Sequence, residues 1–465
     1  RLVATTREQV EVEDRRIERV STTDEIGLGV RVVVDGAWGF AATSSLDAKS
    51  IDRATKRALA TAKADAALRQ RLGAPAVELA PTPSVRGSWV SPHSRDPFAV
   101  SPADKAALLL SATAAALGVA GVKHAKAEVT SVREDKLVLT SDGSRVHQIA
   151  FRIVPELSAT AVDRKRGRFA SRDHEAAPML AGWEYVEELE LVQAAPKIAT
   201  EALQKLHAPP VVPGDMHVVL APSNLWLTIH ESVGHPTELD RAVGLEANYA
   251  GTSFLKPSDT GNLQYGSERV GIVADRTQPG GLATVGWDDE CVASQRWDLV
   301  RGGKFVGWQT TREQAAWIGE AASRGCSYGQ GYGGVPFQRM PNVSLQPGSE
   351  DYTTEDLINA TEKGVLVTGR GSWSIDHQRY NFQFGGQMFW KIHRGRLAGV
   401  LRDVAYQANT LAFWRSCDML GGKGTYRLGG SMGDGKGEPS QSNAVSHGCP
   451  PARFKATVIR TGGDR

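Results

Sequence analysis

His230-Glu231-Ser232-Val233-Gly234-His235 is the stretch around which the rest of the chain is organised. Neutral imidazole is a good zinc ligand, and a glutamate beside the first histidine is placed to take a proton from a water molecule that a metal activates. Because the histidines are at i and i+5, about 140° separates them on an ideal helix. Both reach one metal only if the helix widens into a π-type turn or ends at Gly234. The alternative is two unrelated histidines near a chance glutamate.

Length and composition limit the classes of protein to which this chain can belong. A chain of 465 residues exceeds what one hydrophobic core usually supports, which predicts two domains. Its 54 basic and 52 acidic residues nearly balance, which argues against nucleic acid or an anionic membrane as the main partner. No apolar run approaches the ~18 residues of a membrane span. The 4 cysteines contain no CxxC pair and indicate free thiols in a reducing compartment, so we expect a cytoplasmic protein.

The first half of the chain predicts an α/β domain with an antiparallel sheet and helices. A hairpin with Asp35-Gly36 as its turn is expected at 29–44, and Ser101 is expected to cap a helix that ends near Gly118. Pro196 divides the helical pattern of 187–206, which predicts two helices or one kinked helix. The remaining expectations are a helix at 46–72, a loop at 75–97 and strands at 127–133, 136–140 and 145–154.

The best linker candidate is the proline-rich stretch 209–214, which places the domains at 1–208 and 215–465. A short strand at 216–220 precedes a helix that starts at Pro222, has Ser223 as its expected cap and carries the histidine motif. Beyond Asp240, glycine, proline, aromatic and β-branched residues dominate, which predicts a mostly β domain. The expected fold class is therefore α+β, with the metal-site helix in the C-terminal, mostly β domain.

A catalytic zinc site needs a third protein ligand. Glu238 and Asp240 follow the motif closely and are candidates, although a role for Glu238 as the acceptor of a hydrogen bond from an imidazole is an equal alternative. Three further candidates lie in the glycine-rich C-terminal region: Asp434, His447 and Cys449. Chemistry alone divides the role about evenly between Asp434 and Cys449, and a flexible surface loop is the alternative interpretation of this region.

Several long motifs carry a family resemblance: HESVGHPTELDRA followed by EANYAGTSF, ATVGWDDEC, RMPNVSLQPG, SWSIDHQRYNFQF and AVSHGCP. Over nearly its whole length the chain resembles the TldD/PmbA metallopeptidase family, in its TldD branch. The resemblance implies an N-terminal α/β domain, a largely β C-terminal domain and a zinc peptidase that cleaves unfolded or short peptides. It also implies a heterodimer with a TldE/PmbA-like partner. His230 and His235 match the family's histidine ligands, and Glu231 matches its general base.

The chain departs from the family pattern at one ligand position. The family places a cysteine ligand in a Cys-Gly-Lys segment, which here reads Asp434-Gly435-Lys436. A carboxylate also binds zinc, so His230, His235 and Asp434 are the expected ligands of Zn²⁺, with Cys449 as the alternative third ligand. Because a carboxylate is harder and less electron-donating than a thiolate, we expect a stronger Lewis acid and a wider choice of metal.

The expected reaction is peptide hydrolysis in which the metal polarises the carbonyl and Glu231 carries a proton from water to the leaving amine. The substrate is expected to lie extended along a sheet edge. The candidates for stabilising the oxyanion are His377, Arg379 and Tyr380. Two alternative functions stay open: a biosynthetic tailoring hydrolase that acts on a small natural product or conjugate, and a non-catalytic partner subunit that has lost its metal.

Overall fold

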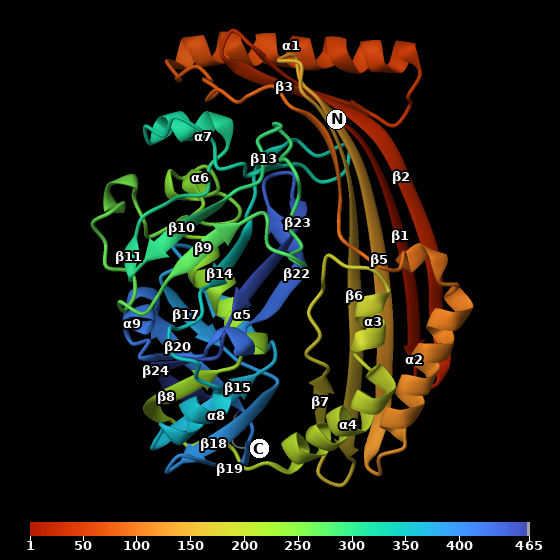
Figure 1. Cartoon of the computed structure of the whole chain (residues 1–465), viewed down its shortest axis with the longest axis vertical. Helices are drawn as coiled ribbons and strands as arrows, with labels where there is room; N and C mark the ends of the chain where they lie inside the picture. Colours follow the sequence, from red (N-terminus) through yellow and green to blue (C-terminus); the bar gives the residue numbers. More distant parts are fainter. Residues whose placement is uncertain (463–465) are drawn as a thin grey trace.

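The computed structural model describes residues 1–462. Figure 1 shows two halves side by side: a long, twisted sheet from the first part of the chain and a β-rich body from the rest. The mixed fold confirms the expected α+β class. Among these residues, no helix combines the length and the apolar character that crossing a membrane requires.

The sheet of the first half has the strand order β3-β2-β1-β5-β6-β4, with β7 paired to β6. Its strands are β1 (Leu2–Glu13), β2 (Arg16–Val34), β3 (Ala37–Thr43), β4 (Arg86–Val90), β5 (Val122–Leu139), β6 (Arg145–Asp163) and β7 (Arg168–Asp173). The pairs are antiparallel, except that β4 runs parallel to β6. Two expectations were wrong: 127–133 and 136–140 belong to one strand because β5 keeps its register with β1 throughout, and the loop at 75–97 contains β4.

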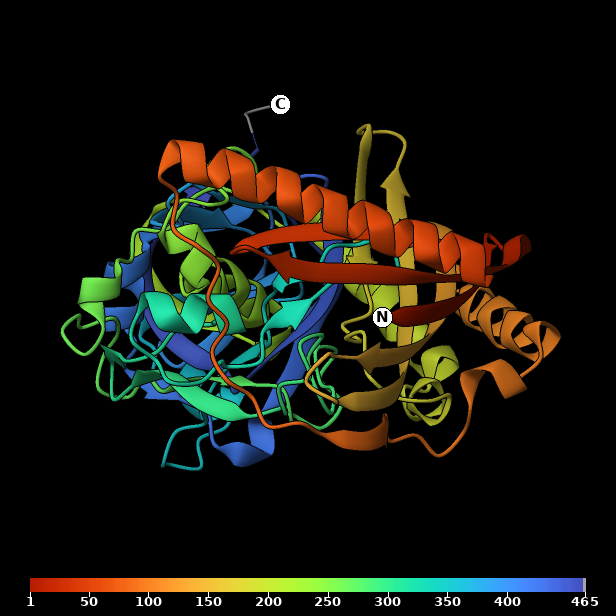
Figure 2. The same ribbon diagram turned by 90° about the horizontal axis from the view of Figure 1, so that it is seen from above.

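Helices border this sheet: α1 (Ala48–Leu72), η1 (Pro97–Ala99), α2 (Pro102–Leu117), α3 (Glu184–Glu188) and α4 (Leu191–His207). Figure 2 shows α1 lying across both halves. The hydroxyl of Ser101 accepts the Asp104 N–H, which confirms the expected cap of α2. Pro196 lies inside one continuous α4. The helical stretch is divided instead between α3 and α4, where Glu190 has a left-handed backbone with a φ of 46°.

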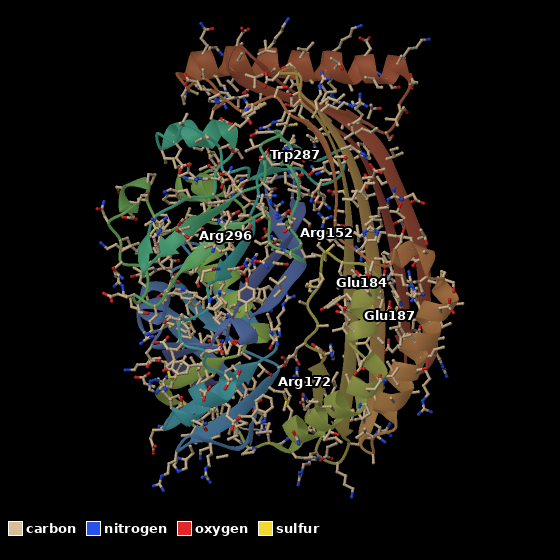
Figure 3. The ribbon with its side chains drawn as sticks, viewed as in Figure 1. Arg152, Arg172, Glu184, Glu187, Trp287 and Arg296 are labelled. Atoms are coloured by element: carbon tan, nitrogen blue, oxygen red, sulfur yellow. The ribbon has the colours of Figure 1, made fainter. Side chains whose placement is uncertain are left out.

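Side-chain alternation along β6 gives the sheet two different faces. Ile153 and Leu157 are buried in a core that includes residues of α2 and α4. Arg152 points the other way, and its Nε donates to the Leu282 carbonyl of the second half at 3.2 Å. Figure 3 labels Arg152 and Trp287, which lie where the halves meet. Beyond these contacts a cavity of about 1050 Å³ separates the sheet from the second half.

The main sheet of the second half has the order β16-β17-β20-β24-β8-β15-β18-β19, with β21 paired to β24. Its strands are β8 (Gly214–Leu220), β15 (Lys363–Thr368), β16 (Trp373–Ile375), β17 (Asn381–Phe384), β18 (Met388–His393), β19 (Arg396–Leu401), β20 (Val404–Asn409), β21 (Met419–Leu420) and β24 (Ala452–Arg460). Val218 and Leu220 belong to the large core of this half and Val219 to a smaller one, which shows that β8 is covered on both faces. This central strand leads directly into the helix that carries the motif.

Smaller sheets and short helices complete the second half. Its other strands are β9 (Ile272–Asp275), β10 (Arg296–Arg301), β11 (Lys304–Phe305), β12 (Ser327–Tyr328), β13 (Phe337–Gln338), β14 (Asn342–Leu345), β22 (Arg427–Lys436) and β23 (Gln441–Cys449). Its helices are α5 (Pro222–Ile229), η2 (His230–Gly234), α6 (Leu239–Ala242), η3 (Pro257–Asp259), α7 (Arg312–Trp317), α8 (Thr354–Asn359), α9 (Thr410–Arg415) and η4 (Lys423–Thr425). Since the two large sheets lie on either side of 209–214, we propose this segment as the domain boundary, between 1–208 and 215–465.

Candidate metal and catalytic site

The motif lies on a helix that changes its period at the first histidine. Helix α5 begins after Ala221, so Ser223 is not its cap; the Ser223 hydroxyl instead accepts the Gly369 N–H at 3.0 Å. From His230 to Gly234 the helix is of the π type, and the His235 N–H donates to the His230 carbonyl at 3.0 Å. The predicted π-type turn is therefore confirmed. The extra residue in this turn brings both histidines to one side of the helix.

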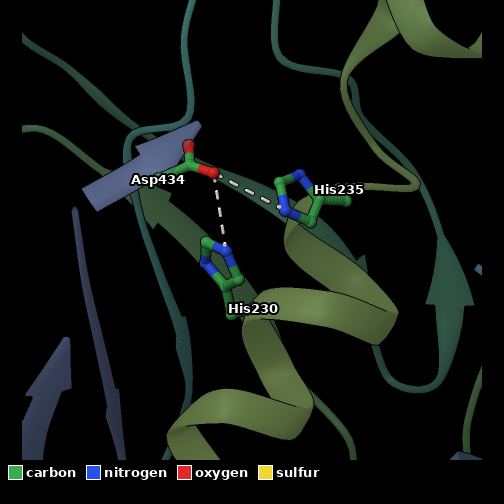
Figure 4. Close-up of side chains that lie close together, drawn as sticks. All are labelled: His230, His235 and Asp434. Carbon is green, nitrogen blue, oxygen red and sulfur yellow. Dashed lines mark ion pairs between the residues drawn. The ribbon is translucent and has the colours of Figure 1, made fainter. Parts of the chain in front are cut away.

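Both histidines point at one carboxylate oxygen of the strand β22 (Figure 4). The Nε2 atoms of His230 and His235 each lie 3.6 Å from Oδ1 of Asp434. Within the described chain, these three residues form a group whose ligand atoms lie within 4.8 Å of one another, and all three are buried. Two imidazole nitrogens and one carboxylate oxygen at this spacing can bind a single divalent ion.

Hydrogen bonds determine which nitrogen of His230 is free. Nδ1 of His447 lies 2.8 Å from the carbonyl of Val343 and must donate to it, which leaves Nε2 of His447 as an acceptor. Nδ1 of His230 lies 2.8 Å from this acceptor and therefore carries the proton. Its Nε2 then has a lone pair that faces Asp434. Burial, followed by the charge of Arg379, lowers the pKa of His230 to about 3, so the ring is neutral.

A buried carboxylate orients His235 in the same way. Oε2 of Glu238 lies 2.9 Å from Nδ1 of His235 and accepts a hydrogen bond from its N–H, which leaves Nε2 free. Glu238 also accepts hydrogen bonds from Nε of Arg241 at 2.8 Å and from Nζ of Lys436 at 3.1 Å. Burial opposes ionisation of Glu238, but Lys436 and Arg241 hold its pKa well below the usual value. Glu238 thus serves as the imidazole partner that the sequence left as an alternative to a metal ligand.

The third residue of the group is fixed by a buried arginine. Nη2 of Arg339 donates to the Asp434 carbonyl and lies 3.3 Å from its Oδ2. This contact occupies one carboxylate oxygen and leaves Oδ1 facing the histidines. The side chain of Arg339 is fully buried, so the pair is shielded from solvent. Asp434 is therefore placed to bind a metal through a single oxygen.

The other candidate ligands lie elsewhere in the site or outside it. Asp240 accepts a hydrogen bond from Nζ of Lys436 at 2.8 Å, and His447 is engaged by His230. Sγ of Cys449 lies 3.7 Å from the carbonyl of Pro222, at the start of α5. Burial raises the pKa of the Cys449 thiol far above its usual value, which opposes thiolate formation. Neither His447 nor Cys449 joins the group of three.

Glu231 lies beside this group and is paired with an arginine. Nη1 of Arg379 donates to Oε2 of Glu231, and the side chain of Trp373 lies close enough to Glu231 to favour its ionised form. Burial raises the pKa of Glu231, although the Arg379 charge opposes the rise. Of the candidates for the oxyanion, Arg379 alone has this contact: Tyr380 packs against the Phe254 ring at 5.3 Å, and His377 gives its carbonyl to the Thr252 N–H.

Several residues of the site were missed in the sequence. Lys436 shares a face of β22 with Asp434 because it lies two positions further along the strand, and this alternation was a usable signal. Arg241 follows Glu238 by three residues, a helical spacing that also predicts contact. Arg339 is distant in sequence, and no local pattern marks it. Burial of these cations around the carboxylates is a tertiary property.

Comparison with protein families identifies three consecutive matches. Residues 1–62 match the PmbA/TldA metallopeptidase domain 1, residues 95–208 its central domain and residues 213–460 its C-terminal domain. A Methanothermobacter thermautotrophicus protein named metalloprotease is 28% identical over 454 residues, which cover 96% of this chain and 92% of that protein. A Saccharolobus solfataricus protein named zinc metalloprotease TldD homolog is 23% identical over 256 residues, or 54% of this chain and 52% of that protein.

Solved structures resemble this fold at low sequence identity. TldE from Thermococcus kodakarensis has a TM-score of 0.67 at 17% identity, with 98% of this chain and 96% of that chain covered. A Thermotoga maritima protein named for a proposed action on DNA gyrase has a TM-score of 0.74 at 16% identity, with 98% and 95% covered. At these identities the similarity concerns the fold.

Proposed function

The chain belongs to the PmbA/TldA metallopeptidase family, here called the TldD/PmbA family. We propose that it is a metallopeptidase that cleaves unfolded or short peptides, with Glu231 as the general base. The observation that carries the proposal is the approach of two neutral imidazoles to one carboxylate oxygen, 3.6 Å from each, beside a buried glutamate. Two lone pairs and one anionic oxygen suit a divalent metal, and the glutamate, which is not one of these three groups, can serve in proton transfer.

We assign His230, His235 and Asp434 as the ligands, and Zn²⁺ as the metal. The Nδ1–H donations to His447 and Glu238 support this assignment, because they leave both Nε2 lone pairs directed at Oδ1 of Asp434. The name of the Saccharolobus relative supports zinc. We do not assign Cys449, since burial raises the pKa of its thiol and its Sγ lies against the Pro222 carbonyl.

A zinc ion bound there supplies a Lewis acid that polarises the scissile carbonyl and lowers the pKa of a water molecule. The proposed role of Glu231 is to take a proton from that water on a carboxylate oxygen and to deliver it to the leaving amine nitrogen. Its raised pKa strengthens it as a base near neutral pH. Arg379 is the cation nearest to this carboxylate, and we propose that it stabilises the oxyanion.

The substrate strand has an available partner. Strand β22 pairs with β23 alone among the described strands, so no strand occupies its other edge. Residues 429–433 of β22 line the cavity, and Asp434 follows directly. An extended peptide paired with this edge would lead to the metal ligands, which supports binding by strand addition.

We also propose that the chain works as the catalytic subunit of a heterodimer with a TldE/PmbA-like partner, a proposal that rests on the family. A cytoplasmic location is part of the proposal. All four cysteines are free and buried in the described chain, which supports a reducing compartment.

The function is tested by incubating the zinc-loaded protein, alone and with a co-expressed TldE-like partner, with a short unstructured peptide. Mass spectrometry is expected to show cleavage that a chelator abolishes and Zn²⁺ restores. A complex with a 1:1 mass in light scattering and higher activity than the chain alone is expected for the heterodimer. Intact peptide in every arm with zinc present would contradict the peptidase assignment.

His447 is expected to support metal binding without touching the metal. Replacing His447 with Ala removes the acceptor for the Nδ1–H of His230 and should weaken Zn²⁺ binding by roughly 10- to 100-fold. His447→Gln is the matched control, because its amide can accept from His230 and donate to the Val343 carbonyl. Competition with a chromogenic chelator measures both affinities. Equal affinities of the parent and the alanine variant would show that His447 does not orient His230.

A further inference from the structure

Arg370 carries a guanidinium that the proposed reaction does not use. It follows β15 and lies on the wall of the large cavity. Its Cζ atom lies 5.8 Å from the ring centre of Trp226 and 4.8 Å from that of Trp373. In the part of the chain that the structure describes, no carboxylate forms an ion pair with this group, and its side chain makes no hydrogen bond. Two aromatic rings thus position an exposed cation that has all its donors available.

The same two rings border the catalytic groups. Trp226 precedes His230 by about one helical turn, and its ring stacks on that of His447 at 6.2 Å with an interplanar angle of 8°. The side chain of Trp373 lies close to Glu231 and favours its ionised form. Arg370 therefore lies between one ring next to a proposed metal ligand and another next to the proposed base. It stands at the junction of the cavity and the reacting centre.

The opposite wall of the cavity carries the carboxylates of Glu156 and Asp173 beside the ammonium group of Lys126. Glu11, Glu128 and Glu156 lie directly opposite one another on β1, β5 and β6 of the first sheet. Like charges in such a row are unfavourable for a sheet, and the neighbouring Lys126 is already engaged, with its Nζ 2.7 Å from Glu11. Glu156 itself lines the cavity. An anion in the cavity is repelled by this wall and attracted to Arg370.

We propose that Arg370 binds the α-carboxylate of the peptide substrate, so that the enzyme cleaves close to a free C-terminus. This inference rests on the proposed peptidase function and deepens it. A planar guanidinium accommodates a carboxylate through two parallel hydrogen bonds. The α-carboxylate is present on every linear peptide whatever its sequence, which suits an enzyme that binds its substrate through the main chain. The carboxylates of the opposite wall favour the amino end of the same peptide on the far side of the cavity.

Binding tests this proposal independently of turnover. The zinc-loaded Glu231→Gln protein is titrated with a fluorescent hexapeptide that carries either a free or an amidated C-terminus. The free acid is expected to bind roughly 10- to 100-fold more tightly, and Arg370→Gln should abolish the difference by weakening the acid alone. Arg370→Lys keeps the charge but loses the planar fork, so it should retain an intermediate preference.

Arg427→Gln is the matched control. Arg427 is another exposed arginine that lines the cavity, but its guanidinium donates to the Gly424 and Tyr426 carbonyls. This variant should keep the full preference for the acid. Equal binding of acid and amide to the parent, no binding of either, or an equal loss of both in Arg370→Gln would overturn the proposal. If the acid preference depends on Arg370 but no peptide is cleaved by the protein with its native Glu231, the peptidase function fails while the carboxylate site stands.

Discussion

Replacing Glu231 with Gln is expected to lower kcat for peptide cleavage by about 10²- to 10⁴-fold. The amide keeps the size of the side chain and an oxygen that can accept from Arg379, but it cannot take a proton from water. Zinc content should stay at one per chain, because Glu231 is not among the proposed ligands. Initial rates by mass spectrometry and metal content by elemental analysis measure the two quantities.

Glu290→Gln makes the same chemical change at another buried, arginine-paired glutamate. Oε1 of Glu290 lies 2.9 Å from Nη1 of Arg31, and this pair joins the two halves away from the metal ligands. Its kcat should stay close to that of the parent. If Glu231→Gln cleaved peptide at the parent rate, the base would have to be another residue. If it lost its zinc, Glu231 would belong to the ligand set.

Replacing Asp434 with Asn is expected to weaken zinc binding by more than the roughly 10- to 100-fold typical of groups outside the ligand set, and to abolish cleavage. The amide oxygen can keep the contact with Arg339, and its NH₂ group then faces the histidines without a lone pair. Asn also keeps a side-chain acceptor for the buried Arg339, which in addition donates to the backbone carbonyls of residues 434 and 441. Chelator competition measures the affinity.

Two further variants identify the third ligand. Asp434→Cys supplies a thiolate and should restore zinc binding but discriminate more strongly against Mn²⁺, because the softer sulfur disfavours a hard ion. Cys449→Ala should keep one zinc per chain with unchanged affinity. The opposite pattern, with zinc lost in Cys449→Ala and kept in Asp434→Asn, would assign the third ligand to Cys449.

Short-range features of the fold were predictable from the sequence because neighbouring residues produce them. Asp35-Gly36 indicated the β2–β3 turn, and both residues have the positive φ that a tight hairpin turn needs. Ser101 indicated the start of α2. Where an expectation was wrong, the contact that overrode it was distant in sequence: the Ser223 hydroxyl binds the Gly369 N–H and does not cap α5.

The same distinction between short-range and long-range contacts holds for the site. The six residues from His230 to His235 by themselves determined two imidazoles, one carboxylate and the need for a wider helical turn, since one helix positions all of them. The residue that faces this turn, Asp434, is positioned by the β22–β23 hairpin. The register of this hairpin pairs Cys449 with Arg427. Arg427 precedes Asp434 by seven residues, so Cys449 lies about 23 Å along the strand from Asp434. Of these two candidate ligands, only Asp434 therefore lies beside the histidines. Strand register and the burial of Arg339 depend on contacts between distant segments, and for that reason only the tertiary structure could show that Asp434, which the sequence ranked ahead of Cys449, lies beside the histidines.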